Sequence, residues 1–164
     1  MIRAVTVARL LEAVQALAIT FWVGTLWSTG LLVAPLLFLV LDDRTLAGTV
    51  AGRVFEVTAL AGLVCGALLL AVFVLMRRAG AFRQMAFWVV IALLALVLIG
   101  QFGLQPVMAS LREQAYPQPV MSSALGSSFA AWHAAAQVIY LLQCLLGAAL
   151  VISRRMEVAG GVRR

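Results

Sequence analysis

Four long runs without a charged residue alternate with short charged segments along the chain. Each run is mostly apolar, and a transmembrane helix needs about 20 such residues in succession. The pattern therefore predicts an all-α polytopic membrane protein, an antiparallel four-helix transmembrane bundle with one integral membrane domain over residues 1–164. The expected spans are 13–41, 57–76, 85–109 and 128–152.

The first run is longer than one bilayer crossing requires. As an α-helix, residues 13–41 would extend about 43 Å at 1.5 Å per residue, against a hydrocarbon core of about 30 Å. Pro35 lies near the end of this run. Its ring removes a backbone donor and crowds the carbonyl of Leu31. We therefore expect a kink or a local break at Pro35.

Composition agrees with a bilayer environment. The chain is 65% hydrophobic and 11% charged, and its mean hydropathy is +1.10. Soluble domains are about a quarter charged. The net charge of +6 would also suit nucleic acid. However, the arginines flank apolar runs instead of forming a basic face with interleaved aromatic residues, so no nucleic-acid partner is expected.

The arginines also predict an orientation, because cytoplasmic loops carry an excess of basic residues. One side of the membrane would hold nine arginines and the other side three (Arg44, Arg53 and Arg112). We expect both termini to be cytoplasmic, with segments 42–52 and 112–127 outside. The expected location is the inner, or cytoplasmic, membrane.

Uncommon polar residues from all four spans fall at a similar depth, in the outer half. Such groups face protein or water in preference to lipid. They predict a small polar pocket that opens outward, although hydrogen bonds between helices would place the same residue types there. The candidates are Thr25, Arg53, Glu56, Gln101, Gln105, His133 and Gln137.

His133 is the only histidine in the chain. An unpaired imidazole facing hydrocarbon is costly, because no water can satisfy it there. We expect His133 to face the bundle interior and to bond Gln105 or Thr25. It is also the one weak candidate for a metal ligand.

Glycines at a spacing of four residues occur twice along the second predicted helix and its approach. Small residues at this spacing let helices pack closely. We expect Gly48, Gly52, Gly62 and Gly66 to serve helix packing within the bundle, with a homo-oligomer as the alternative.

The chain lacks the nucleotide-binding and hydrolase motifs that carry a known chemistry. One histidine cannot supply two haem ligands within one chain. The residues favour a non-enzymatic module that handles an ion or small solute, or supports a membrane complex. The alternative is a metal- or haem-linked redox protein that uses His133.

Several stretches resemble one family. They are "FWVGTLW", "VAPLLFLVLDDRTLAGTVAGRVF", "FGLQPVMASLR" and "WHAAAQVIYLLQCLLG". Together they resemble the transmembrane-205-like bacterial membrane proteins, the domain of unknown function numbered 4149. The resemblance implies a four-span membrane protein of undefined biochemical role.

The same family is distantly similar to the copper-resistance D membrane domain and to the haem-linked membrane protoporphyrinogen oxidase. Both carry a histidine early in the first span, where this chain has Gln15. Glutamine is a poor haem or copper ligand compared with imidazole. No cofactor is therefore predicted, and haem or copper stays the alternative.

The orientation is directly testable with fusions. A cytosolic reporter placed after Arg164 should be active, and a periplasmic reporter placed there should be silent, because nine of the twelve arginines lie on that side. Reporters inserted in 118–126 should give the opposite result. Reversed activities at both positions would overturn the orientation.

Overall fold

The computed structural model describes the backbone of residues 2–161 and the side chains of 6–76 and 80–153. Every regular element in this part of the chain is helical. In order they are α1 (Ile2–Ser28), the π-helical η1 (Thr29–Val33), α2 (Ala34–Val40), α3 (Arg44–Arg77), the 3₁₀ segment η2 (Arg78–Arg83), α4 (Met85–Leu98), the π-helical η3 (Ile99–Leu104), α5 (Gln105–Ala115), the 3₁₀ segment η4 (Val120–Ser122) and α6 (Gly126–Gly161).

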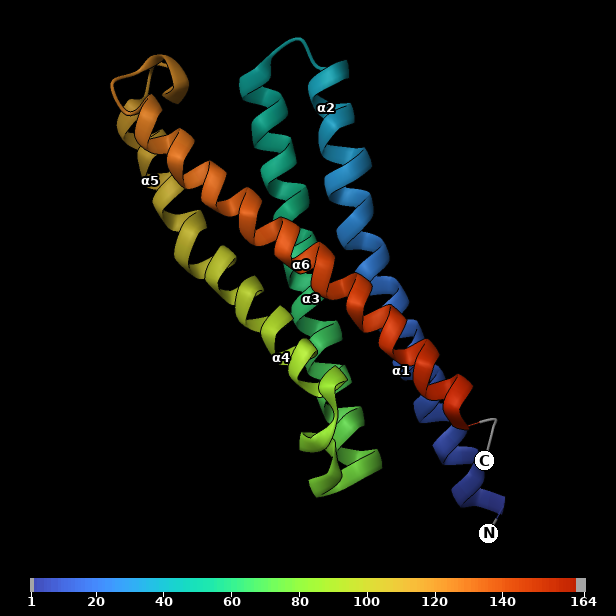
Figure 1. The fold of residues 1–164 in the computed structure, drawn as a ribbon. Helices are drawn as coiled ribbons and strands as arrows, with labels where there is room; N and C mark the ends of the chain where they lie inside the picture. Colours follow the sequence, from blue (N-terminus) through green and yellow to red (C-terminus); the bar gives the residue numbers. More distant parts are fainter. Residues whose placement is uncertain (1, 162–164) are drawn as a thin grey trace.

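These elements join into four long helices, which we call rods. This confirms the predicted all-α bundle. The rods are long and apolar enough to cross a membrane, over Thr6–Val40, Arg44–Met76, Met85–Ala115 and Gly126–Ser153. The start of α1 and the end of α6 lie at one end of the molecule, together with η2 (Figure 1). We call this the terminal end, and the opposite end, with the 42–43 turn and the 116–125 connection, the distal end.

The second rod begins earlier than the sequence suggested. The predicted span was 57–76, but α3 already begins at Arg44, within the segment 42–52 that was expected outside the membrane. The Asp43 carboxylate accepts hydrogen bonds from the backbone N–H groups of Thr45, at 2.8 Å, and Leu46, at 3.1 Å. Such N-caps satisfy the free donors of a first helical turn. The charged residues of this segment are therefore compatible with a helix.

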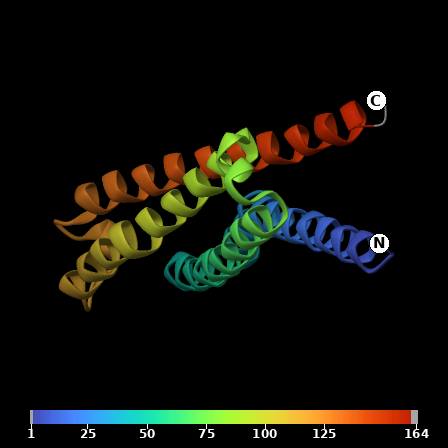
Figure 2. The same ribbon diagram turned by 90° about the horizontal axis from the view of Figure 1, so that it is seen from below.

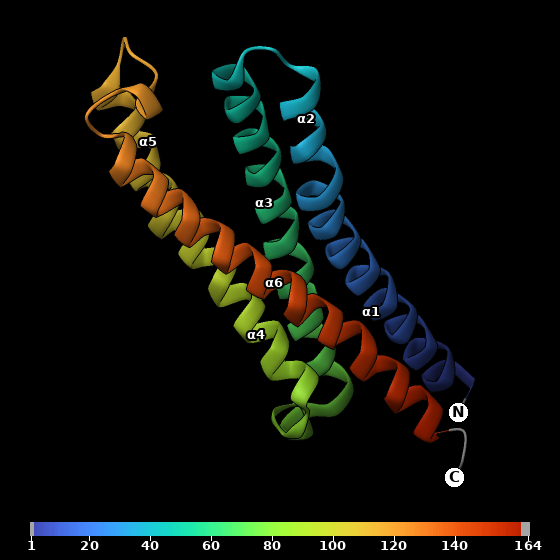
Figure 3. The same ribbon diagram turned by 45° about the horizontal axis from the view of Figure 1, so that its top comes forward.

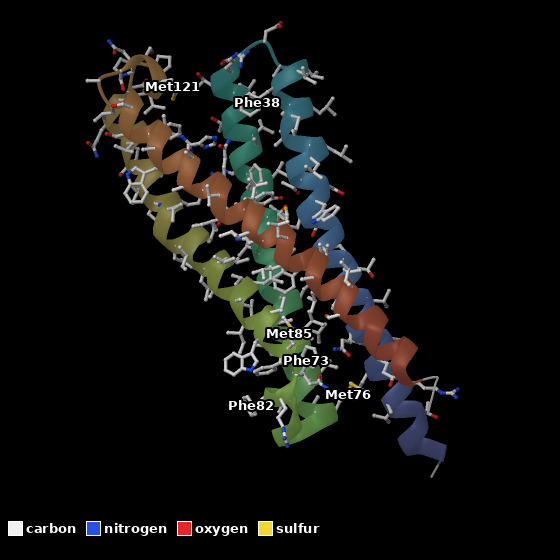
Figure 4. The ribbon with its side chains drawn as sticks, in the orientation of Figure 1. Phe38, Phe73, Met76, Phe82, Met85 and Met121 are labelled. Atoms are coloured by element: carbon white, nitrogen blue, oxygen red, sulfur yellow. The ribbon has the colours of Figure 1, made fainter. Side chains whose placement is uncertain are left out.

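The main core lies in the terminal half, where all four rods meet. Trp22 of α1 is only 2% exposed and packs in a cluster with Leu69 of α3, Leu93 of α4 and Leu150 of α6. Trp22 is therefore a core residue. Near the α3–α4 turn, Phe73 and Phe82 extend the packing, and Figure 4 shows them at the terminal end with Met76 and Met85.

Two of the four predicted packing glycines lie in this core. A Cβ atom on Gly62 would stand 2.6 Å from the Trp22 indole nitrogen. One on Gly66 would collide with Leu94 and approach Trp22 to 3.0 Å. Close approach of α1 and α4 to α3 therefore requires glycine at both positions.

The distal half is organised differently, because the rods separate there into two hairpins. One consists of α1, η1, α2 and α3, and the other of α4, η3, α5 and α6. Figures 1, 2 and 3 show the hairpins diverging toward the distal end. Gly48 has only the Phe38 ring nearby, at 3.9 Å, and Gly52 has no neighbour within 4 Å. These two glycines are not covered by the other hairpin.

Both hairpins contain a π-helical segment directly before a proline. The Ala34 N–H donates to the carbonyl of Thr29, and the Gln105 N–H donates to that of Gly100, each five residues back. Pro35 and Pro106 follow at once. At Pro35 the backbone stays helical through Val40 and does not break. The wider turn accommodates a ring that would otherwise clash with the carbonyl four residues earlier.

Tyr140 of α6 connects the two hairpins at the middle of the molecule. Its hydroxyl donates to the carbonyl of Leu26, and its ring packs edge-on against Phe55 of α3 with centroids 5.0 Å apart. The ring also lies directly over Gly30, where a Cβ atom would overlap it. One helical turn further along α6, the carbonyl of Cys144 accepts a 3.2 Å hydrogen bond from the Trp27 indole.

The contact at Gly30 can be tested with a matched pair of substitutions. Gly30→Ala should lower the unfolding free energy by about 1–3 kcal/mol, because the new methyl group displaces the Tyr140 ring. Gly24→Ala should have no such cost, since nothing lies within 4 Å of its Cβ position. Thermal unfolding in detergent measures both. Equal stability of the two variants would contradict the packing described here.

Candidate functional site

The single histidine lies on the surface of α6 instead of in the bundle interior. Its side chain is exposed, its ring stacks on Phe129 with centroids 6.0 Å apart, and its Nε2 lies 3.4 Å from Nε2 of Gln137. The prediction that His133 faces the interior and bonds Gln105 or Thr25 is therefore wrong. The physical reason is the divergence of the hairpins, which leaves no α1 residue beside this part of α6.

Around His133 the distal part of α6 carries a short chain of polar and aromatic contacts. The Arg112 guanidinium lies over the Phe129 ring, 5.1 Å from its centroid. Phe129 stacks on His133, which in turn contacts Gln137. Cation–π contacts of this kind stabilise a positive charge without a carboxylate. We call the two exposed α6 residues of this chain of contacts, His133 and Gln137, the α6 polar stripe.

The other predicted pocket residues lie apart from this stripe. Arg53 and Glu56 form a 2.9 Å ion pair on α3, with side chains 79% and 40% exposed. Thr25 donates its hydroxyl proton within α1, to the carbonyls of Phe21 and Trp22. Gln101 and Gln105 are half-buried on η3 and α5. Among the described side chains, no hydrogen bond joins these residues into one pocket.

The structure has an open, mostly apolar hollow elsewhere, between α1 and α3. Its volume is about 450 Å³, and five of its lining residues bear hydroxyl groups. The lining residues are Thr20, Thr25, Ser28, Thr29, Thr58, Phe21, Gly24, Val57 and Ala61. Of the seven residues predicted to form a pocket, only Thr25 belongs to it. We call it the hydroxyl groove.

Sequence reasoning missed one buried polar contact because it depends on how two helices meet. Thr29 and Thr58 are 5% and 8% exposed, and their hydroxyl oxygens are 2.8 Å apart. Gln143 is also buried, on the side of α6 that carries Leu150. A partial signal existed, since hydroxyl-bearing residues recur along 20–29. Their partner on α3 could not be read from the sequence.

Few of the described side chains lie where they could bind a metal ion together. No three His, Cys, Asp or Glu side chains gather within the described part of the chain. Met108 is buried and packs with Phe129 and Leu104, whereas Met121 is 64% exposed on the distal connection. Figure 4 shows Met121 at the distal end of the molecule. His133 therefore has no second strong ligand in the described residues beside it.

Four apolar membrane-spanning rods packed as two hairpins define a small polytopic membrane protein. Within that class, a family model described as a domain of unknown function, DUF4149, matches residues 17–117, and the chain belongs to this family. No curated protein matches the chain. No solved structure matches it either.

The placement of His133 predicts a small effect on stability. His133→Gln and His133→Leu should each change the unfolding free energy by less than about 0.5 kcal/mol, as is usual at exposed positions. Tyr140→Phe is the positive control, because it removes a hydrogen bond between the hairpins and should cost about 1 kcal/mol. If His133→Leu destabilised the protein as much as Tyr140→Phe, the imidazole would have a buried partner.

Proposed function

We propose that this protein is a non-enzymatic module of the bacterial inner membrane, with both termini cytoplasmic, that takes up an ion or small polar solute between its two hairpins from the outer side. The observation that carries the proposal is the exposed α6 polar stripe, which lies within a membrane-spanning helix at the end where the hairpins diverge.

The depth of the stripe supports this proposal. His133 and Gln137 follow the start of α6 at Gly126 by seven and eleven residues, or about 10 and 16 Å along the helix. At such depth a polar side chain needs a partner in protein or water, because hydrocarbon offers none. Their own mutual contact, at 3.4 Å, leaves hydrogen-bonding capacity unused.

The direction of the stripe supports it as well. His133, Gln137, Tyr140 and Cys144 are spaced by four, three and four residues, so they share one side of α6. Tyr140 and Cys144 on that side contact Leu26 and Trp27 of the other hairpin. His133 and Gln137 therefore face the space into which the hairpins diverge, and water that enters there can accompany a polar solute.

Two other roles are compatible with the same surface. A transmembrane partner, or a second copy of this chain, could occupy that space, and the module would then support a membrane complex. Haem or copper, suggested by the distant resemblance to the copper-resistance D domain, would need further ligands from another chain, because Phe129 and Gln137 are the described contacts of His133.

Thiol labelling in whole cells tests the proposed water-filled space. His133→Cys and Gln137→Cys should react with a membrane-impermeant maleimide added outside at least roughly tenfold faster than Val138→Cys, because thiols ionise in water and not in hydrocarbon. Val138 is a suitable control, since it is next to Gln137, 58% exposed, and turned by about 100° toward lipid.

The native cysteines must be removed first, as Cys65→Ala and Cys144→Ala. The second change is tolerable because Trp27 bonds the backbone carbonyl of residue 144 and not its thiol. Protection of both stripe positions by a solute in excess would identify that solute. Equal, slow labelling at all three positions would refute access from outside and favour an interface covered by protein.

A further inference from the structure

The charges of the chain are divided unevenly between its two ends. Nine arginines and two acidic residues, Glu12 and Glu157, occur in the sequence at or next to the terminal ends of the rods. The other three arginines and four acidic residues occur toward the distal ends. The terminal end therefore holds the whole positive excess of the chain. A surface with such an excess attracts anionic partners.

The turn between α3 and α4 holds three of these arginines. Arg77 ends α3, and Arg78 and Arg83 begin and end the 3₁₀ segment η2. No acidic residue occurs in the sequence between Glu56 and Glu113. On these two rods the nearest carboxylate to the turn is thus about 30 Å away along the helix. Figure 1 also shows the turn apart from both termini.

Arg83 lies directly before the first turn of α4. Its side chain is exposed, and it forms no ion pair with any described side chain. The N-terminus of a helix carries a partial positive charge, so the dipole of α4 disfavours a guanidinium there. Arg77, by contrast, ends α3, where the helix dipole favours a positive charge. An external anion would therefore stabilise the charge of Arg83 in particular.

Large apolar side chains of the same turn are exposed. Phe82, Met85 and Trp88 have 57%, 78% and 56% of their surface accessible. The Trp88 indole N–H donates to the Phe82 carbonyl at 3.0 Å, and both rings pack edge-on against the buried Phe87. Figure 4 shows Phe82 and Met85 at the terminal end. The turn thus presents a fixed apolar surface together with a positive charge.

The position of the turn along the rods places it at a membrane surface. The second apolar span ends at Met76 and the third begins at Met85, so η2 lies between them. Tryptophan and arginine are typical of this boundary. Lipid phosphates lie there directly beside the hydrocarbon that takes up exposed rings such as those of Phe82 and Trp88.

These features discriminate among phosphate-containing partners. A free phosphate ion would pair with Arg83 but would leave Phe82, Met85 and Trp88 uncovered. A zwitterionic phospholipid would cover them but would bring its own cation to a turn that already has three positive charges. An anionic phospholipid supplies hydrocarbon chains and a phosphate without an accompanying cation.

We propose that the α3–α4 turn binds an anionic glycerophospholipid. Its phosphate pairs with the Arg83 guanidinium, and its acyl chains lie against Phe82, Met85 and Trp88. This site is at the terminal end, whereas the proposed function uses the space between the hairpins at the distal end. The proposal also holds whichever side of the membrane the terminal end faces.

Native mass spectrometry of the full chain, released from detergent micelles, tests the proposal. The micelles contain equal amounts of dioleoyl phosphatidylglycerol and dioleoyl phosphatidylcholine, and the measured quantity is the ratio of the two singly bound lipids. The protein should retain the anionic lipid roughly fivefold better, as expected for about one basic residue near an anionic headgroup. Arg83→Gln should bring this ratio close to one.

Arg9→Gln is the matched control. Arg9 is also an exposed arginine of the terminal end, but it lies on α1. Both variants remove one positive charge from the same end, and both change an exposed side chain, so both should fold. Arg9→Gln should keep the preference for phosphatidylglycerol. An equal loss in the two variants would indicate a diffuse attraction to the whole end and would overturn the assignment to the turn.

A soluble competitor separates a lipid site from a phosphate site. Glycerophosphoglycerol has the headgroup of phosphatidylglycerol without its acyl chains, and a large excess should displace little of the bound lipid. Complete displacement would overturn the lipid as the ligand and favour a free phosphate ester. Equal retention of the two lipids by the unmodified protein would overturn the proposal altogether. A preference that persists in Arg83→Gln would overturn the role of Arg83.

Discussion

The arrangement of the two hairpins depends on the close approach of Tyr140 to Gly30. At this point the α6 ring lies on a backbone without a side chain, so its hydroxyl reaches the Leu26 carbonyl and its edge meets Phe55. Only a few contacts hold α6 against α1 here, with the Trp27 indole bond to Cys144 beside it. On the terminal side of this contact all four rods share a core. On the distal side the two hairpins diverge. The position of this one aromatic residue thus separates a packed half from an open half.

The same geometry explains why the polar residues on either side of this contact have different surroundings. Thr29 and Thr58 lie where α1 and α3 are still in contact, so they bond each other and are buried. His133 and Gln137 lie where the hairpins have separated, so they bond within α6 and are exposed. Inside a bilayer the second situation requires another partner, whereas the first is satisfied internally.

The π-helical segments before Pro35 and Pro106 give the hairpins a common local design. Each carries the rod past a proline without breaking it, because a wider turn removes the clash between the ring and the preceding carbonyl. The first segment also contains Thr29, which lines the hydroxyl groove, and Gly30, over which the Tyr140 ring lies. The proline therefore influences both the packing of α6 and the shape of the groove.

The sequence alone determined the membrane environment and the four helical rods, because these depend on long uncharged apolar runs. The ion pair of Arg53 with Glu56 likewise needs only a spacing of three residues along one helix. The sequence did not indicate how far α3 extends before the predicted span 57–76, where Asp43 caps the first turn. The surroundings of His133 and the partner of Thr29 were decided only by the tertiary structure. Helical spacing specifies which residues share a face, but the crossing of α6 over α1 and α3 decides which faces meet a neighbour and which remain open.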